Sequence, residues 1–145
     1  MIVTFKKLFG GEGYYAEIVV SLIESISAES QIVDNCTWAN QKAIHNNINL
    51  GPGHLEWKKY VLKGMEYALR KIRYNNTIKI SLDDLTGHIL HTSNSTMYAV
   101  GIISVFKLLS IDIRETDHNS INNLVKGSRS FNSKVKIEDF QISEY

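Results

Sequence analysis

Two aspartates and two histidines stand close together in the middle of the sequence and could together bind a metal ion. They are Asp83, Asp84, His88 and His91, and carboxylates and imidazoles are ligands of zinc and other transition metals. However, a His-x-x-His pair on a loop or strand does not present both rings on one face, as an i, i+4 helical pair would. We therefore interpret segment 83–94 as a polar connection, predict no metal and no cofactor, and rank an enzyme using this cluster last.

The single cysteine, Cys36, is the other candidate for catalysis, because a histidine could activate it as a nucleophile. The chain has five histidines, which are His45, His54, His88, His91 and His118. No nucleophile-elbow or cysteine-protease pattern surrounds Cys36, so we interpret it as a small buried apolar side chain and predict that the protein is not an enzyme. One cysteine cannot form an intrachain disulfide, which fits a reducing compartment, with the cytoplasm as the default.

Segment 10–13, Gly-Gly-Glu-Gly, has the composition of a phosphate-binding loop but not the context of one. Phosphate loops follow a strand and open a helix, whereas here a second strand is predicted to follow, and Glu12 would repel phosphate. We therefore predict a hairpin turn at this position.

A basic stripe is predicted on the helix over 54–73. Its apolar residues recur three and four apart, at Trp57, Val61, Met65, Ala68, Leu69 and Ile72. The opposite face carries Lys59, Lys63, Arg70 and Arg73, with Glu66 among them. Such a stripe is either a solvated helix face or a contact for nucleic acid or an acidic protein. The whole chain has 16 basic and 15 acidic side chains, so no global field favours nonspecific binding of polyanions.

The elements that would position these residues follow from hydrophobic periodicity. Segments 1–8, 14–26 and 77–82 alternate apolar and polar residues as strands do, and 97–109 is apolar enough for a buried helix with Ser93, Asn94 or Ser95 as N-cap. Segment 27–52 is irregular, and Pro52 between two glycines marks a restart of the chain. A short helix at 121–125 and a strand at 135–142 are further predictions.

The length of 145 residues and the 43% apolar composition fit one domain with one core. The order of elements predicts an α+β fold with helices packed on one face of a sheet. No segment has the pattern of a signal peptide or the length and apolarity of a membrane span, so we expect no membrane association.

Several strings resemble the fourth domain of translation elongation factor G, in the same order over residues 1–112. Lys6-Lys7 and segment 10–20 are similar to the first hairpin of that domain, and Pro52-Gly53 with segment 63–69 is similar to its proline-led helix. Segment 91–99 is similar to its tip histidine and the start of its second helix. The resemblance implies a four-stranded sheet with two helices on one face over 1–112, and leaves 113–145 as a C-terminal extension packed on or beside it.

The resemblance also implies two loop tips, at 10–15 and 88–95, which in the family reach the decoding region beside transfer RNA. This chain departs from the family there. Glu12 and Tyr14 replace a basic and a polar residue, Thr92 and Asn94 replace acidic ones, and no GTPase phosphate loop is present. These departures make a role in translocation a poor prediction.

We therefore expect a non-catalytic macromolecule-binding module, in the first place an inhibitor of the immunity-protein type that neutralises a toxin. The alternative is a translation-associated module that binds the ribosome or RNA through the two tips. The candidate partner-binding residues are Gly11, Glu12, Tyr14, His88, His91, Lys59, Lys63, Arg70 and Arg73.

Overall fold

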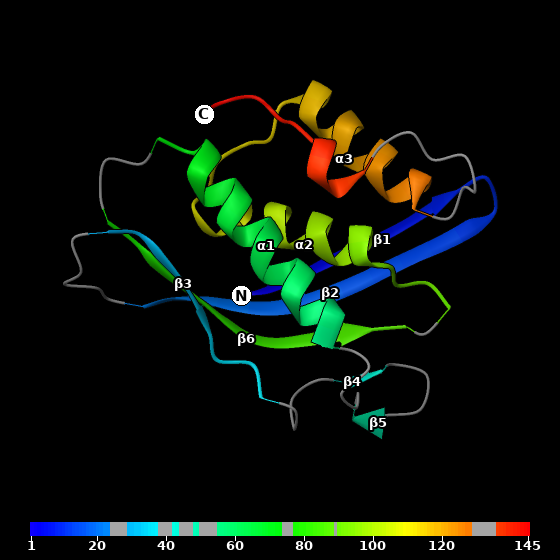
Figure 1. The fold of residues 1–145 in the computed structure, drawn as a ribbon, viewed down its shortest axis with the longest axis horizontal. Helices are drawn as coiled ribbons and strands as arrows, with labels where there is room; N and C mark the ends of the chain where they lie inside the picture. The colour runs from blue at the N-terminus through cyan, green and yellow to red at the C-terminus, as the bar shows by residue number, and fades with distance from the viewer. Residues whose placement is uncertain are drawn as a thin grey trace.

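The computed structural model describes residues 1–23, 29–37, 42–43, 48–49, 55–73, 77–88, 90–128 and 136–145 (Figure 1). Pro52, His45 and His54 lie outside the described residues, as does half of segment 27–52, which was predicted to be irregular. The predicted α+β class is confirmed, because helices cover one face of a mixed sheet whose main part has four strands.

These four strands lie in the order β1 (Ile2–Phe9), β2 (Glu12–Ile23), β6 (Lys79–Gly87) and β3 (Gln31–Asp34). The β1–β2 and β2–β6 pairs are antiparallel, and β3 is parallel to β6. Strand β4 (Lys42–Ala43) also pairs with β6 and is joined by β5 (Ile48–Asn49). On β1 and β2 the alternate residues Val3, Phe5, Ala16, Ile18 and Val20 are buried, as the period-two pattern predicted.

The hairpin turn between β1 and β2 has only two residues. Gly10 and Gly11 both have positive φ, at 57° and 85°, a conformation that residues with a Cβ rarely adopt. Two consecutive positive φ angles match the twist of the flanking strands and give a tight hairpin. Glu12 and Gly13 therefore already belong to β2, paired with Phe9 and Leu8.

Strand β6 is longer than predicted. It was expected to end at Leu82, yet it continues to Gly87 through an irregularity in which Val19 and Val20 face Asp84 and Leu82. Asp83 is the extra residue, and such a bulge shifts the alternation of side chains from there on. The prediction of an exposed connection beginning at Asp83 was therefore wrong, because the bulge hides the period-two signal of the second half of the strand.

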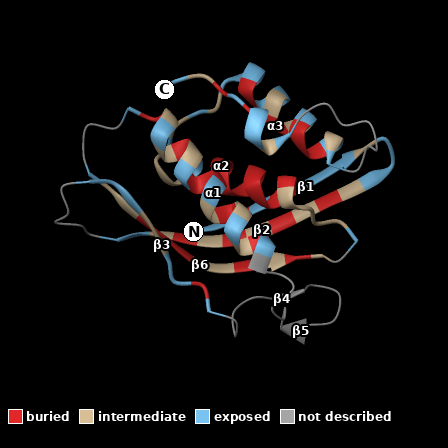
Figure 2. Ribbon diagram, viewed as in Figure 1, coloured by how far each residue is buried: buried red, intermediate tan, exposed pale blue. Residues whose placement is uncertain are grey.

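Helices α1 (Leu55–Lys71) and α2 (Asn94–Leu108) cover one face of the sheet (Figures 1 and 2). The predicted N-cap is confirmed, since the Ser93 hydroxyl accepts from the Thr96 amide at 3.1 Å. The two helices cross closely at Gly64 and Gly101, where an added Cβ would lie 2.2 Å from the Tyr98 carbonyl oxygen and 2.4 Å from that of Val61. No helix in the described part of the chain is long and apolar enough to cross a bilayer.

The C-terminal extension differs most from the prediction. A helix was expected only at 121–125, and the structure has α3 over Glu115–Gly127. The strand expected at 135–142 was wrong for residues 136–142, which form the 3-10 helix η2 (Ile137–Asp139) and an irregular segment. Phe140 and Ile142 of this segment are buried in the same core as the sheet and both long helices.

Candidate functional site

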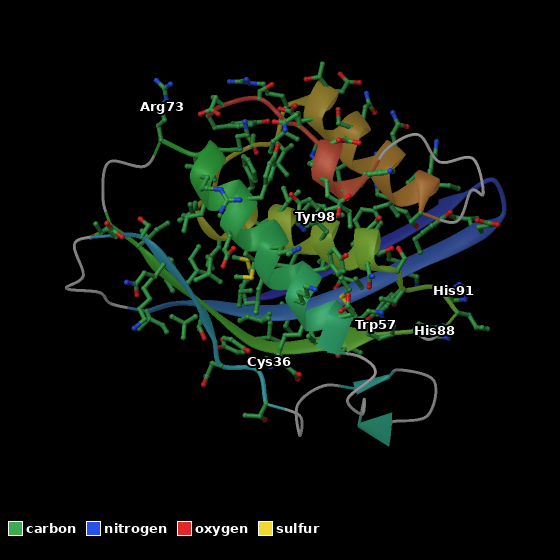
Figure 3. The ribbon with its side chains drawn as sticks, viewed as in Figure 1. Cys36, Trp57, Arg73, His88, His91 and Tyr98 are labelled. Atoms are coloured by element: carbon green, nitrogen blue, oxygen red, sulfur yellow. The ribbon has the colours of Figure 1, made fainter. Side chains whose placement is uncertain are left out.

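The two tips meet at one end of the molecule, where they are joined by backbone and side-chain hydrogen bonds. The Tyr15 amide donates to the His91 carbonyl oxygen at 2.9 Å, and the Thr92 hydroxyl donates to the Tyr15 carbonyl oxygen at 2.6 Å. His91 Nδ1 lies 3.1 Å from the Gly13 carbonyl oxygen, and because a carbonyl only accepts, this nitrogen carries the hydrogen. The start of β2 and the turn after β6 thus form one unit (Figure 3).

The turn after β6 is itself ordered by local hydrogen bonds. The His91 and Thr92 amides both donate to the His88 carbonyl oxygen, at 2.9 and 2.8 Å, and the Thr92 hydroxyl accepts from the His88 amide at 2.7 Å. The Leu90 amide donates to His88 Nδ1 at 3.2 Å, so this nitrogen presents a lone pair and His88 Nε2 carries the hydrogen. The two imidazole rings are stacked with their centroids 4.4 Å apart.

An open cleft of about 710 Å³ lies where the hairpin and this turn meet. We call it the tip cleft. Its lining residues are Lys6, Lys7, Leu8, Gly13, Tyr14, Tyr15, His88 and His91. Lys6 and Leu8 alternate with the buried Val3 and Phe5, so they point to the sheet face opposite α1 and α2. Leu8 is 72% exposed, and Leu90, in the turn between the two histidines, is 68% exposed.

The acidic side chains next to the tip cleft are held by hydroxyl groups. The Glu12 carboxylate accepts from the Tyr14 hydroxyl at 3.0 Å, and that of Glu17 accepts from the Thr4 hydroxyl at 2.9 Å. Burial, and after it the charge of Glu17 and a hydrogen bond to its carboxylate, raises the pKa of Tyr15 to about 12. Tyr15 therefore enters the cleft wall as a neutral phenol. No aspartate or glutamate is among the residues that line the cleft.

The predicted contact residues of the tips differ in how much surface they offer. Gly11 and Glu12 are exposed and His88 and His91 are half-buried, whereas Tyr14 is buried with its ring 5.5 Å from that of Phe9. Tyr14 thus supports the hairpin from the core side and offers little of its surface to a partner.

The basic stripe of α1 is a separate surface. Lys59, Lys63, Arg70 and Arg73 are all exposed, as predicted, but α1 ends at Lys71, two residues before the predicted end of the helix. Arg73 therefore follows the helix, at the end of the molecule opposite His88 and His91 (Figure 3). None of the four lines the tip cleft. Glu56 lies 3.6 Å from the Lys59 ammonium, and Glu66 is exposed on the same helix, so the stripe is of mixed charge.

The cluster of two aspartates and two histidines is divided between two places. Asp83 sits in the β6 bulge, where its carboxylate accepts from the hydroxyls of Ser21 at 2.6 Å and Ser81 at 2.5 Å. Burial acts to raise the pKa of Asp83, but these hydrogen bonds and one from Asn35 outweigh it and lower the pKa overall. Within the described residues, no three His, Cys, Asp or Glu side chains are grouped so that they could hold a metal ion.

Cys36 is buried beside β6, away from the tip cleft. Burial, and after it the charge of Asp84, raises the pKa of its thiol to about 11. A thiol with a raised pKa is a poor nucleophile near neutral pH, because little thiolate is present.

Sequence reasoning missed the apolar part of the tip cleft. Leu8 and Leu90 were not among the candidate contact residues, although Leu8 stands out of phase with Val3 and Phe5 on a strand whose alternation was clear. Lys6, Lys7 and Tyr15 entered only through the family resemblance, because their closeness to His88 and His91 depends on pairings across more than 70 residues.

Comparison with known proteins supports the fold and leaves the function open. No protein-family model matches this chain, and no curated protein sequence does so. A crystal structure of a protein from Thermus thermophilus is similar, with a TM-score of 0.50 and 15% sequence identity over 76% of this chain. The matched part is 15% of that protein, so this chain spans only a small share of its length. At this identity the similarity shows a shared fold alone.

Proposed function

We propose that this chain is a non-catalytic protein-binding module that contacts its partner through the tip cleft. The observation that carries the proposal is the exposure of Leu8 in the wall of an open cleft that hydrogen bonds hold in shape, with a second exposed leucine, Leu90, in the turn between two lining histidines. Exposed apolar side chains around a concave surface are typical of protein contact sites, where a few of them supply most of the binding energy.

Two further observations support a binding role over catalysis. The Cys36 thiol is buried with a raised pKa, and the Asp83 carboxylate is occupied by two serine hydroxyls away from the histidines. Neither group is placed to act on a molecule in the tip cleft. The residues that do line it are suited to hold a partner through hydrogen bonds, charge and apolar contact.

The test is co-purification of the tagged full chain from its native host, with two matched variants. Leu8→Asp places a charge at the tip cleft, and Ile2→Asp places one at the other end of the same strand face, where Ile2 is 67% exposed. We expect the natural chain and Ile2→Asp to retain one protein partner in stoichiometric amount and Leu8→Asp to lose it. Equal retention by Leu8→Asp, or recovery of the chain alone, would contradict the proposal.

The alternative function is binding to the ribosome or to RNA, and the observation in its favour is that Lys6, Lys7 and the two histidines share the cleft. RNA contacts release counterions, so binding would weaken steeply as salt rises. Cosedimentation with ribosomes that falls steeply between low and moderate salt would favour the alternative. The mixed charge of the α1 stripe weighs against it, because Glu56 and Glu66 interrupt the row of basic side chains.

Neutralisation of a toxin stays a prediction from the sequence and is the specific form of binding that we propose. It is tested with the captured partner itself. Expression of that partner alone should stop growth, and co-expression with this chain, but not with Leu8→Asp, should restore it. A captured partner without toxicity would leave protein binding in place and remove the immunity-type role.

A further inference from the structure

Strand β1 lies at the edge of the sheet, since it pairs with β2 on one side and, among the described residues, with no strand on the other. The outward backbone groups of an edge strand can act as a template for a further strand. We infer that the strand added here is β1 of a second copy of the chain, so that two sheets join antiparallel into one. This inference goes beyond the proposed function and does not depend on it.

Two hydrogen bonds at the start of the hairpin show which backbone groups of β1 point outward. The Met1 nitrogen donates to the Val20 carbonyl oxygen at 2.6 Å, and the Val20 amide donates to the Met1 carbonyl oxygen at 2.9 Å. In an antiparallel pair, residues bonded in this reciprocal way alternate with residues whose N–H and C=O point away from the neighbouring strand. The register of β1 and β2 is unbroken, so the residues with outward groups are Ile2, Thr4, Lys6 and Leu8.

These outward groups are accessible. Within the part of the chain that the structure describes, no hydrogen bond engages the outward N–H and C=O groups. The side chains of the same residues alternate with the buried Val3 and Phe5, and Ile2 and Leu8 are 67% and 72% exposed. Strand β1 also lacks a proline and a bulge, two devices by which edge strands avoid pairing. The edge is therefore open to a further strand along its length.

One antiparallel register between two copies satisfies all of these groups at once. It places Ile2 opposite Leu8 of the second copy and Thr4 opposite Lys6 of the second copy, and the two-fold axis repeats both pairs in reverse. Each pair can exchange two backbone hydrogen bonds, and the apolar side chains meet each other on the open face. A shift by two residues would oppose either Lys6 to Lys6 or Ile2 to Lys6, and both shifts separate the apolar side chains.

A charge on the open face favours the same register and a second copy as the occupant. Glu17 is the β2 neighbour of Thr4, and its carboxylate accepts from the Thr4 hydroxyl at 2.9 Å, so it lies toward β1. Lys6 of the second copy, opposite Thr4, would extend the same row with an ammonium group of opposite charge. A lysine on an edge strand usually opposes pairing. Here the chain itself supplies the matching carboxylate, and it does so twice in a symmetric dimer.

The first test is sedimentation equilibrium together with amide hydrogen exchange at low and high protein concentration. Strand pairing buries little surface, so we expect a dimer with a dissociation constant between about 1 µM and about 1 mM. As concentration rises, the mass should increase from that of one chain towards that of two. Exchange should slow at the outward amides of Thr4 and Lys6, whereas the inward amide of Phe5 should be protected throughout. A monomer at about 1 mM would overturn the inference.

A proline tests whether the backbone of the edge makes the contact. Thr4→Pro removes an outward N–H, and proline is tolerated where the N–H of an edge strand faces solvent. The matched control Thr4→Ala also lacks the hydroxyl but keeps the N–H. We expect Thr4→Pro to dimerise at least about tenfold more weakly than Thr4→Ala. Equal dimerisation of the two variants would place the interface elsewhere and overturn the inference.

A pair of charged variants tests the register without changing the backbone. Ile2→Asp and Leu8→Lys each place a charge opposite an apolar side chain, so each variant alone should dimerise at least about tenfold more weakly. In a mixed dimer the new carboxylate faces the new ammonium at one pair, and the natural Ile2–Leu8 pair remains at the other. The mixture should therefore dimerise more tightly than either variant alone. A mixture that dimerises no better would contradict the register, and with it the inference.

The outcomes are distinguishable from those of the proposed function. Ile2→Asp and Leu8→Asp should weaken the dimer alike, because the two residues form one pair, whereas only Leu8→Asp should release the captured partner. A strand of another protein is the other occupant that this edge could take. If the chain stays monomeric and the outward amides are protected only in the complex with a captured partner, the edge binds that partner, and the inference is overturned.

Discussion

The tip cleft and the C-terminal segment, residues 136–145, treat their apolar side chains in opposite ways. The C-terminal segment buries Phe140 and Ile142 against α1 and α2, and Phe140 packs against the rings of Tyr67 and Tyr98 at centroid distances of 5.7 and 5.9 Å. The tip cleft leaves Leu8 in water, as the turn between His88 and His91 leaves Leu90, and it is held together by hydrogen bonds instead.

The hydrogen-bonded polar groups of the two regions also differ, since those of the C-terminal segment are buried and those of the tips lie near the surface. Asp117 on α3 is buried, and its carboxylate accepts from Tyr145 and from both the amide and the hydroxyl of Ser143. At the tips the corresponding bonds lie near the surface, where water competes for them and reduces their net contribution. The contrast indicates that the C-terminal segment stabilises the fold, whereas the tips contribute less to its stability and keep their surface accessible.

Of the substitutions that test this contrast, Phe140→Ala should have the largest effect on the free energy of unfolding. Removal of a buried ring from between two aromatic neighbours should cost about 3–5 kcal/mol of unfolding free energy. Leu8→Ala, which removes an exposed side chain of the tip cleft, should change it by less than about 0.5 kcal/mol. Urea denaturation of both variants checks the pair. Similar losses for the two would show that the tips carry as much stability as the C-terminal segment.

The sequence predicted those elements in which apolar residues recur with the period of a helix or a strand, because that period shows which side chains are buried. The stripe on α1, the alternation on β1 and β2 and the apolar α2 are local patterns and were identified from residues alone. The length of helix α3 was underestimated because Asp117 occupies one buried position of its stripe, and an aspartate in a sequence usually indicates an exposed position. The groups that satisfy Asp117, Ser143 and Tyr145, come from 26 and 28 residues further along the chain.

The site could be predicted only in part, for a related reason. The turn glycines and the histidines were identified as tips, but Thr92 was noted only as a departure from the family pattern. Its role depends on Tyr15, which lies 77 residues away in the sequence. The bulge at Asp83 hid the second half of β6, and with it the strand that places His88 beside the hairpin.

An intermediate effect, with a pH signature, is expected from Tyr145→Phe. The Tyr145 hydroxyl donates to Asp117 at 2.6 Å and accepts from the Arg114 amide at 2.8 Å, so its loss should cost about 1–2 kcal/mol at neutral pH. Burial, and after it the hydrogen bond to Asp117, raises the pKa of Tyr145. Above about pH 10 the unfolded chain therefore loses this proton first, and the stability contributed by the hydroxyl falls as pH rises.

The measurement is the unfolding free energy of the natural chain and of Tyr145→Phe from neutral pH to above pH 10. Contributions of the other tyrosines are common to both proteins, so they cancel in the difference. We expect the advantage of the natural chain to be constant below about pH 9 and to shrink above about pH 10. An advantage that stays constant across the whole range would show that Tyr145 titrates alike in the folded and unfolded chains.

The smallest effect on global stability, but the one that bears most on function, is expected from Thr92→Val. The variant keeps the shape of the side chain but removes the hydroxyl that donates to Tyr15 and accepts from His88. Because water can reach these groups, the unfolding free energy should fall by less than about 1 kcal/mol. The tips should nevertheless separate more often, since the hydroxyl bonds directly to both segments, and hydrogen exchange at the Tyr15 amide should become faster.

The Val20 amide, bonded to the Met1 carbonyl oxygen at the other end of the hairpin, should exchange as before. Thr116→Val, an exposed position on α3, is the matched control and should change neither amide. If Thr92→Val instead accelerates exchange at both amides equally, the tips and the sheet open as one unit, and the tip cleft is as much a part of the stable core as the C-terminal segment.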